Sequence, residues 1–129
     1  MFSLFFDSTH RVLMARVGGT ITLQDLTGIN ASVAAFVERE SLVRFICDMS
    51  AVETVGFTLS EMVCRAQRIA VLPTEERVYV AADPLLFGLC GVFATYQRHA
   101  GNRQPLVVRS LDEAYQALEI IDPDFQPAR

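Results

Sequence analysis

Length, composition and charge limit what this chain can be. It has 129 residues, a usual size for one domain, and 51% of them are hydrophobic while only 20% are charged. With a net charge of −4 and no segment that combines several basic residues with aromatic ones, the sequence argues against nucleic acid as a partner. Arginines interrupt every apolar run before it reaches the roughly 18 residues that a membrane-spanning helix needs. The apolar excess favours a homodimer.

The cysteines and the N-terminal segment predict the compartment. Cys47, Cys64 and Cys90 are odd in number, far apart and placed within predicted helices or strands, which favours small buried thiols over a disulfide framework. Phe2, Leu4 and Phe6 alternate as in a first strand, and no signal-peptide pattern surrounds them. We therefore expect a cytoplasmic protein.

The first forty residues predict a β-hairpin followed by a helix. Aromatic and β-branched residues dominate two runs, 2–7 and 11–17, and the residues between them suit a tight turn. Gly18 and Gly19 then predict a turn that ends the second strand. Thr22 with Asp25 is typical of a helix N-cap, and an apolar residue at every third or fourth position predicts a helix to about Glu40.

The middle of the chain predicts a buried strand, a loop and a second helix. Residues 43–48 form a short apolar run that ends in an acid, as expected for a strand of a parallel sheet. Residues 49–57 are predicted to be a loop. Thr58 with Glu61 is a second N-terminal capping pair, and Pro73 excludes a helix beyond it.

The last third predicts two further strand and helix pairs. Residues 77–82 form the fourth strand, and Asp83 followed by Pro84 begins a helix that Gly101 ends. Residues 105–109 form the fifth strand, and Ser110 with Glu113 begins the fourth helix.

This order predicts an α/β domain at residues 1–121 and a tail at 122–129. The order is ββαβαβαβα, which indicates a single mostly parallel five-stranded sheet with an N-terminal hairpin and four packed helices.

Two segments resemble a known superfamily. Residues 80–89 (VAADPLLFGL) and 107–114 (VVRSLDEA), together with the order of elements, are similar to the STAS domains of sulfate transporters and anti-sigma-factor antagonists. The similarity is to the small bacterial proteins called STAS-like or SpoIIAA-like, most of which have no assigned function. The resemblance implies a non-enzymatic regulatory or protein-interaction module.

The segment after the third strand matches the regulatory turn of these antagonists. Glu53 takes the place of an Asp, Thr54 that of the phospho-acceptor Ser and Val55 that of a second Ser, while Gly56 is unchanged. The resemblance therefore implies Thr54 as phospho-acceptor, Glu53 to Phe57 as partner-binding loop, and an anti-sigma-factor-like kinase or other regulator as partner. A phosphate here would meet free amides at the start of the second helix. The alternative is a solvated loop in which Gly56 permits the turn.

The sequence nominates no catalytic residue, cofactor or metal site. His10 and His99 have no acid or thiol at metal-ligand spacing on their own elements. Gly18 and Gly19 lack the further residues of a dinucleotide or phosphate loop, and no hydroxyl or thiol has a local activating base. We therefore expect no enzyme.

The third predicted helix is apolar on nearly every side. Phe87, Phe93 and Tyr96 add to its aliphatic residues, while Gly88 and Gly91 keep part of it narrow. A helix of this kind is expected to be buried all round. Three explanations stay open: close packing on the sheet, a dimer contact, or the wall of a pocket. The last predicts an alternative function, a carrier or sensor of a small apolar, lipid-like ligand held between this helix and the sheet.

Overall fold

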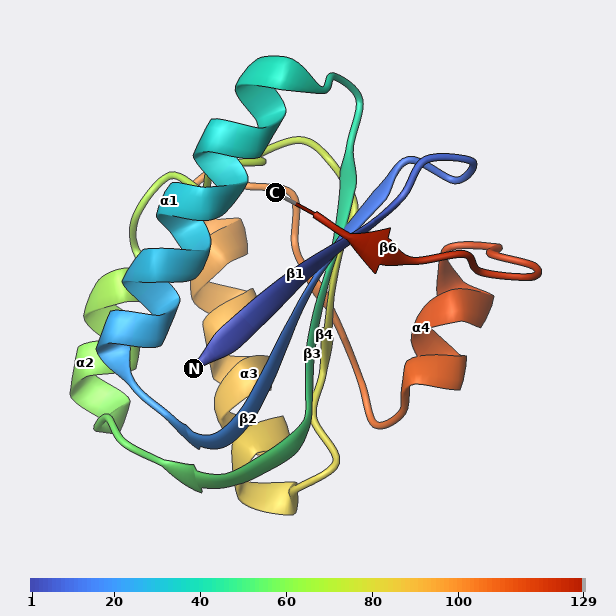
Figure 1. The fold of residues 1–129 in the computed structure, drawn as a ribbon. Helices are drawn as coiled ribbons and strands as arrows, with labels where there is room; N and C mark the ends of the chain where they lie inside the picture. Colours follow the sequence, from blue (N-terminus) through green and yellow to red (C-terminus); the bar gives the residue numbers. More distant parts are fainter. Residues whose placement is uncertain (129) are drawn as a thin grey trace.

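The computed structural model describes residues 1–128, which form an α/β fold around one mixed sheet of six strands (Figure 1). The strands are β1 (Phe2–Asp7), β2 (Val12–Ile21), β3 (Arg44–Val55), β4 (Arg77–Val80), β5 (Leu106–Val108) and β6 (Gln126–Pro127). The helices are α1 (Leu23–Arg39), α2 (Leu59–Ala66), α3 (Pro84–His99) and α4 (Leu111–Ala117). The predicted α/β class, the hairpin and the four helices are confirmed.

The strand order is β5-β4-β3-β2-β1-β6. The pairs β2/β3, β3/β4 and β4/β5 are parallel, while β1 pairs antiparallel with both β2 and β6. The prediction of five strands is wrong, because β6 lies in the segment predicted to be a tail and aligns Gln126 with Phe6 of β1. Two residues that include a proline carry no strand pattern, so only the partner strand reveals β6.

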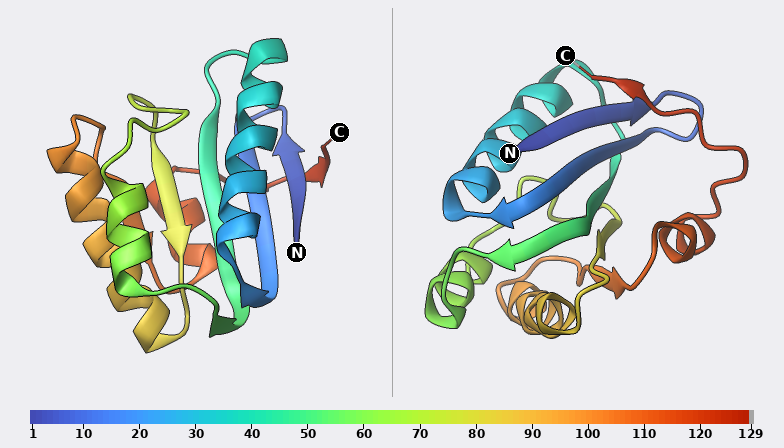
Figure 2. Two further views of the ribbon diagram at one scale, coloured as in Figure 1. Left: turned by 90° about the vertical axis from the view of Figure 1, so that its left-hand side faces the viewer. Right: turned by 60° about the horizontal axis from the view of Figure 1, so that its bottom comes forward.

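Helices cover both faces of the sheet. α1, α2 and α3 lie side by side on one face, and α4 lies on the other (Figure 2). Two buried clusters follow from this arrangement. The larger one, under the three helices, includes Leu13, Ile29, Val33, Phe45 and Leu86. The smaller one, under α4, includes Val12, Met14, Ile46, Val78 and Leu118.

Each helix begins at the cap that the sequence predicts. The side chains of Thr22, Thr58, Asp83 and Ser110 each accept a hydrogen bond from the amide three residues ahead. Thr22 and Thr58 form complete capping boxes, because the Asp25 and Glu61 carboxylates accept from their backbone amides in return. α3 ends at His99, and Gly101 follows its C-cap with a φ of +95° that suits glycine, as expected for the residue that stops this helix.

We expect Thr58→Ala to lower the free energy of unfolding by about 1 kcal/mol, because the first turn of α2 then loses its side-chain acceptor. Urea denaturation measures this difference. Ser60→Ala is the matched control, since Ser60 is exposed in the same turn, and it should stay within about 0.5 kcal/mol of the parent. Equal values for the two variants would contradict the capping role.

The loop predicted at residues 49–57 is mostly strand. β3 continues to Val55 and pairs with β2, which itself continues past Gly18 and Gly19 to Ile21. The register shifts on either side of these glycines, and Gly19 has a φ of +69°. Glycine therefore permits a bulged strand here, where the sequence predicted a turn.

Candidate functional site

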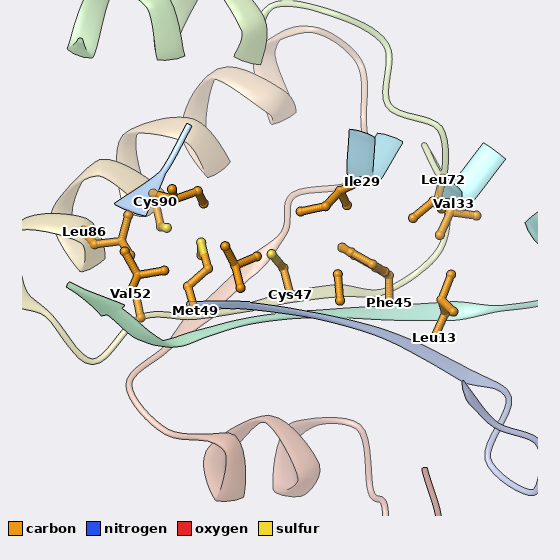
Figure 3. Packing of buried hydrophobic residues seen from close by; sticks show 14 of the residues in the cluster. Leu13, Ile29, Val33, Phe45, Cys47, Met49, Val52, Leu72, Leu86 and Cys90 are labelled. Atoms are coloured by element: carbon orange, nitrogen blue, oxygen red, sulfur yellow. The ribbon is translucent and has the colours of Figure 1, made fainter. Parts of the chain in front are cut away.

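An apolar cavity of about 150 Å³ lies between the sheet and the three helices α1, α2 and α3. Its walls come from β2, β3, β4, the three helices and the connection between α2 and β4. Figure 3 shows side chains from the sheet and from α1 and α3 that point toward one another across this layer. The cavity is the concave, mostly apolar kind of space in which small ligands bind.

Helical and strand periodicities direct the wall residues inward. On β3, Phe45, Cys47 and Met49 alternate and so share one face of the sheet. Ile29 and Val33 are one helical turn apart on α1 and face them (Figure 3). The cavity therefore follows from ordinary amphipathic patterns on elements that do not fill the space between them.

Two thiols line this cavity and both are protonated at neutral pH. Burial raises the pKa of Cys90 on α3 to about 12. Burial, together with the neighbouring Cys90 and Asp48, raises the pKa of Cys47 far above its usual range. The prediction of buried thiols is confirmed for these two and wrong for Cys64, which is exposed on α2.

Tyr79 of β4 places an aromatic ring and a hydroxyl in the wall. Its ring makes edge contacts with Phe45 and Phe93, with centroids 6.4 and 5.4 Å away. Burial raises the pKa of its hydroxyl to about 12, against the opposing effect of the Arg77 charge. The residue is nevertheless partly accessible, as expected if the accessible part of the side chain faces the cavity.

A buried polar network closes one end of the cavity. Arg77, at the start of β4, donates from Nη1 to Oε1 of Gln97 (2.9 Å) and from Nη2 to the Arg103 carbonyl (3.1 Å). Gln97 donates from Nε2 to the carbonyls of Ala66 (2.6 Å) and Arg68 (3.0 Å). The network thereby ties α3 and β4 to the segment that follows α2.

Asn102 completes this network and holds the connection beside the cavity. Its Nδ2 donates to the carbonyls of Arg68 and Gln97, and its Oδ1 accepts from the Ala70 amide. Sequence reasoning missed all three network residues. One signal was present, because Gln97 continues the buried stripe of α3 that contains Leu86 and Ala94.

Two further arginines lie in the cavity wall, both from the end of α2 and the residues after it. Arg65 donates to the Thr27 hydroxyl of α1 at 3.4 Å, and the side chain of Arg68 is exposed. Burial, and then the nearby charge of Arg68, lower the pKa of Arg65. Ile69, which also lines the cavity, is 69% exposed, so this side of the cavity meets the surface.

No family model matches this chain, and no curated protein does. Within residues 1–128, no group of three His, Cys, Asp or Glu side chains is arranged to hold a metal ion. No helix in that range has the length and hydropathy of a membrane span.

The α3 residues predicted to form an apolar contact or ligand surface do not share one face of the helix. Phe93 lines the cavity, whereas Phe87 lies under the guanidinium of Arg109, whose Cζ is 3.9 Å from the ring centroid. Gly88 and Gly91 face outward with no atom near the position of an added Cβ, and Tyr96 is half-buried. The glycines therefore do not narrow α3 for packing.

Within one chain, α3 is not buried all round. Its inner stripe of Leu86, Cys90, Ala94 and Gln97 is buried, but Leu85 is 68% exposed on the outer side. α3 packs on one layer of the protein only, so its apolar outer residues remain at the surface.

The predicted partner-binding loop is also divided. Glu53, Thr54 and Gly56 are exposed, Val55 is half-buried, and Phe57 lines the cavity. Thr54 lies in β3 opposite Thr20 of β2, and the Gly56 amide donates to the Ile21 carbonyl at 2.8 Å. An added Cβ at Gly56 would lie 3.0 Å from this carbonyl oxygen, which accounts for glycine there without a regulatory role.

Proposed function

We propose that this protein is a non-enzymatic module that binds a small apolar ligand between the sheet and helices α1, α2 and α3. The observation that carries the proposal is the cavity of about 150 Å³ lined mainly by aliphatic, aromatic and sulfur-containing side chains. Close-packed interiors contain few voids larger than one water molecule. A mostly apolar space of this size accepts a small apolar molecule.

The volume sets the size of the ligand. An apolar cavity of about 150 Å³ is known to hold a molecule as large as benzene. The wall offers aromatic edges from Tyr79 and Phe93 and polarisable sulfur from Met49 and Met62. We therefore propose a compact apolar body of about six to eight carbon atoms, and toluene is the appropriate first probe.

Cys90→Leu is expected to abolish toluene binding, because the larger side chain occupies part of the cavity. The same filling should raise the free energy of unfolding by about 1 kcal/mol. Titration with toluene, followed through the methyl resonances of Ile29, Val33 and Leu86 by NMR, measures binding. Urea denaturation measures stability.

Cys64→Leu is the matched control, since it makes the same exchange at an exposed thiol outside the cavity wall. It should leave toluene binding unchanged. Failure of the parent protein to bind any small aromatic probe, or equal toluene binding by both variants, would refute the proposed function.

A second candidate is the regulatory, STAS-like protein-interaction module, acting in the cytoplasm as a homodimer. The exposed side chains of Glu53 and Thr54, close in sequence to the start of α2, favour it. In this case Glu53→Lys and Thr54→Asp should each abolish recovery of a defined protein partner in pull-downs without a change in melting temperature. Unchanged recovery would remove this candidate.

A further inference from the structure

The cavity has an unbalanced charge. Arg65, Arg68 and Arg77 line it, whereas no Asp or Glu of the described chain does. Its Cys47, Cys90 and Tyr79 groups all have raised pKa values and are neutral at physiological pH. In a chain with a net charge of −4, this one cavity thus carries three positive charges and no negative charge.

Arg77 is the most unusual of the three arginines. It is 5% exposed, and its partners are all uncharged: the amide of Gln97, a backbone carbonyl and the Tyr79 hydroxyl. Its Nε is buried without any hydrogen-bond partner in the described structure. Within residues 1–128, none of the three arginines has a carboxylate at ion-pair distance. A buried guanidinium is costly unless an anion compensates it.

The three arginines are close in sequence, and part of the apolar wall lies at the other end of the sheet from Arg77. Arg65 and Arg68 come from the end of α2 and the residues after it, and Arg77 begins β4. The connection between α2 and β4 that joins them includes Ile69, a lining residue that is 69% exposed. Ile21 and Phe57 line the cavity where β2 and β3 end, whereas Arg77 lies at the opposite end of the sheet, beside Phe45 near the start of β3.

From this distribution we infer that the ligand is a small amphipathic anion, an apolar body with one carboxylate, whose negative charge is compensated by Arg77 with help from Arg65 and Arg68. This inference rests on the proposed function and adds the chemical class of the ligand. The apolar body takes the space between the sheet and α1, and the carboxylate lies toward the end closed by Arg77 and Gln97. Because Arg77 is buried, its attraction for the anion is only weakly screened by solvent.

Binding of benzoate, benzamide and toluene to the unmodified protein tests this inference, since the three probes share a ring and differ in the charge and polarity of one substituent. Calorimetric titration at neutral pH and low salt should give benzoate at least about tenfold tighter binding than either neutral probe. Equal binding of toluene and benzoate would overturn the anion inference and leave the proposed function intact. Failure of all three probes would overturn both.

Two variants identify the arginines responsible. Arg77→Met should reduce benzoate affinity at least about tenfold more than it changes toluene affinity, because only benzoate loses a charge that compensates its own. The double variant Arg65→Gln with Arg68→Gln removes accessible charges and should weaken benzoate about two- to fivefold, with a smaller effect at high salt. The double variant also keeps the test decisive if Arg77→Met fails to fold.

Arg98→Gln serves as the control, because it removes an exposed charge of α3 that does not line the cavity. Its benzoate affinity should equal that of the parent. If benzoate binding survives in folded Arg77→Met, or is unchanged in the double variant, the arginines do not compensate the carboxylate and the inference is wrong.

Discussion

Gln97→Ala is expected to lower the free energy of unfolding by about 3 kcal/mol. The substitution removes the acceptor of Arg77 Nη1 and the donor to the carbonyls of Ala66 and Arg68. Because Gln97 is 2% exposed, water does not replace these partners without opening the structure. The guanidinium of Arg77 then keeps its charge inside the protein with one neutral partner fewer.

Chemical denaturation of Gln97→Ala measures this loss. Thr95→Ala is the matched control on the same helix, since Thr95 is exposed and its hydroxyl bonds only to the Gly91 carbonyl. The control should differ from the parent by no more than about 0.5 kcal/mol. A loss for Gln97→Ala below about 1 kcal/mol would show that the network contributes little to stability.

Asp7→Ala should destabilise the protein by about 3 kcal/mol as well, at the opposite edge of the sheet. Asp7 is fully buried at the end of β1, and its carboxylate accepts from the backbone amides of His10 and Asp124 at 2.9 Å. Its Oδ2 also lies 2.8 Å from Nδ1 of His10. One carboxylate thus holds both the hairpin turn and the segment that leads into β6.

The same carboxylate makes stability depend on pH. Burial raises the pKa of Asp7, but the hydrogen bonds from Asp124 and His10 outweigh it, so the pKa is lowered from 3.8. The folded state therefore binds this proton less tightly than the unfolded state. The stabilisation is complete above about pH 4 and is lost as the pH falls through the lower folded value.

Denaturation midpoints across acid pH check this dependence. Asp7→Asn should be less stable than the parent at pH 7 and should lose less stability than the parent as the pH is lowered. Glu53→Ala, an exposed exchange on β3, should leave the pH profile unchanged. Parallel profiles for Asp7→Asn and the parent would show that Asp7 does not contribute to the acid transition.

Gln97→Ala and Asp7→Ala both remove buried polar groups that hold peripheral segments in place. Gln97 and Asn102 hold the connection after α2 beside the cavity, and Asp7 holds the C-terminal strand. A cavity persists only if the elements around it resist collapse. The polar network offers a physical reason why the wall near Arg77 keeps its place although the space beside it is not filled by side chains.

Local chemistry explains which parts of this fold were predictable. The helix starts at Thr22, Thr58 and Asp83 depend on hydrogen bonds to amides three residues ahead, so a short sequence window contains all the required atoms. The hairpin between β1 and β2 is local as well. The apolar residues that recur along α1 are local too, and Ile29, Val33 and Phe36 among them are buried.

Long-range pairing explains what the sequence did not reveal. The extension of β3 to Val55 exists because β2 continues beside it, and β6 exists because β1 offers an open edge. Neither segment carries enough pattern of its own to predict a strand, since edge pairing contributes backbone hydrogen bonds that no side-chain type encodes. The exposure of the outer face of α3 was not predicted, because the hydropathy of a helix does not determine how many of its sides are covered by other elements.

The candidate site illustrates the same division. Local sequence patterns were enough to predict the α/β order, the helix caps and an unusually apolar α3, because these features depend on residues close together along the chain. Only the tertiary structure placed Arg77 against Gln97, 20 residues away, and opened a cavity bounded by β3, β4 and three helices. The cavity and the uncompensated charge of Arg77 arise only when distant elements pack together. No local pattern of residues predicts them.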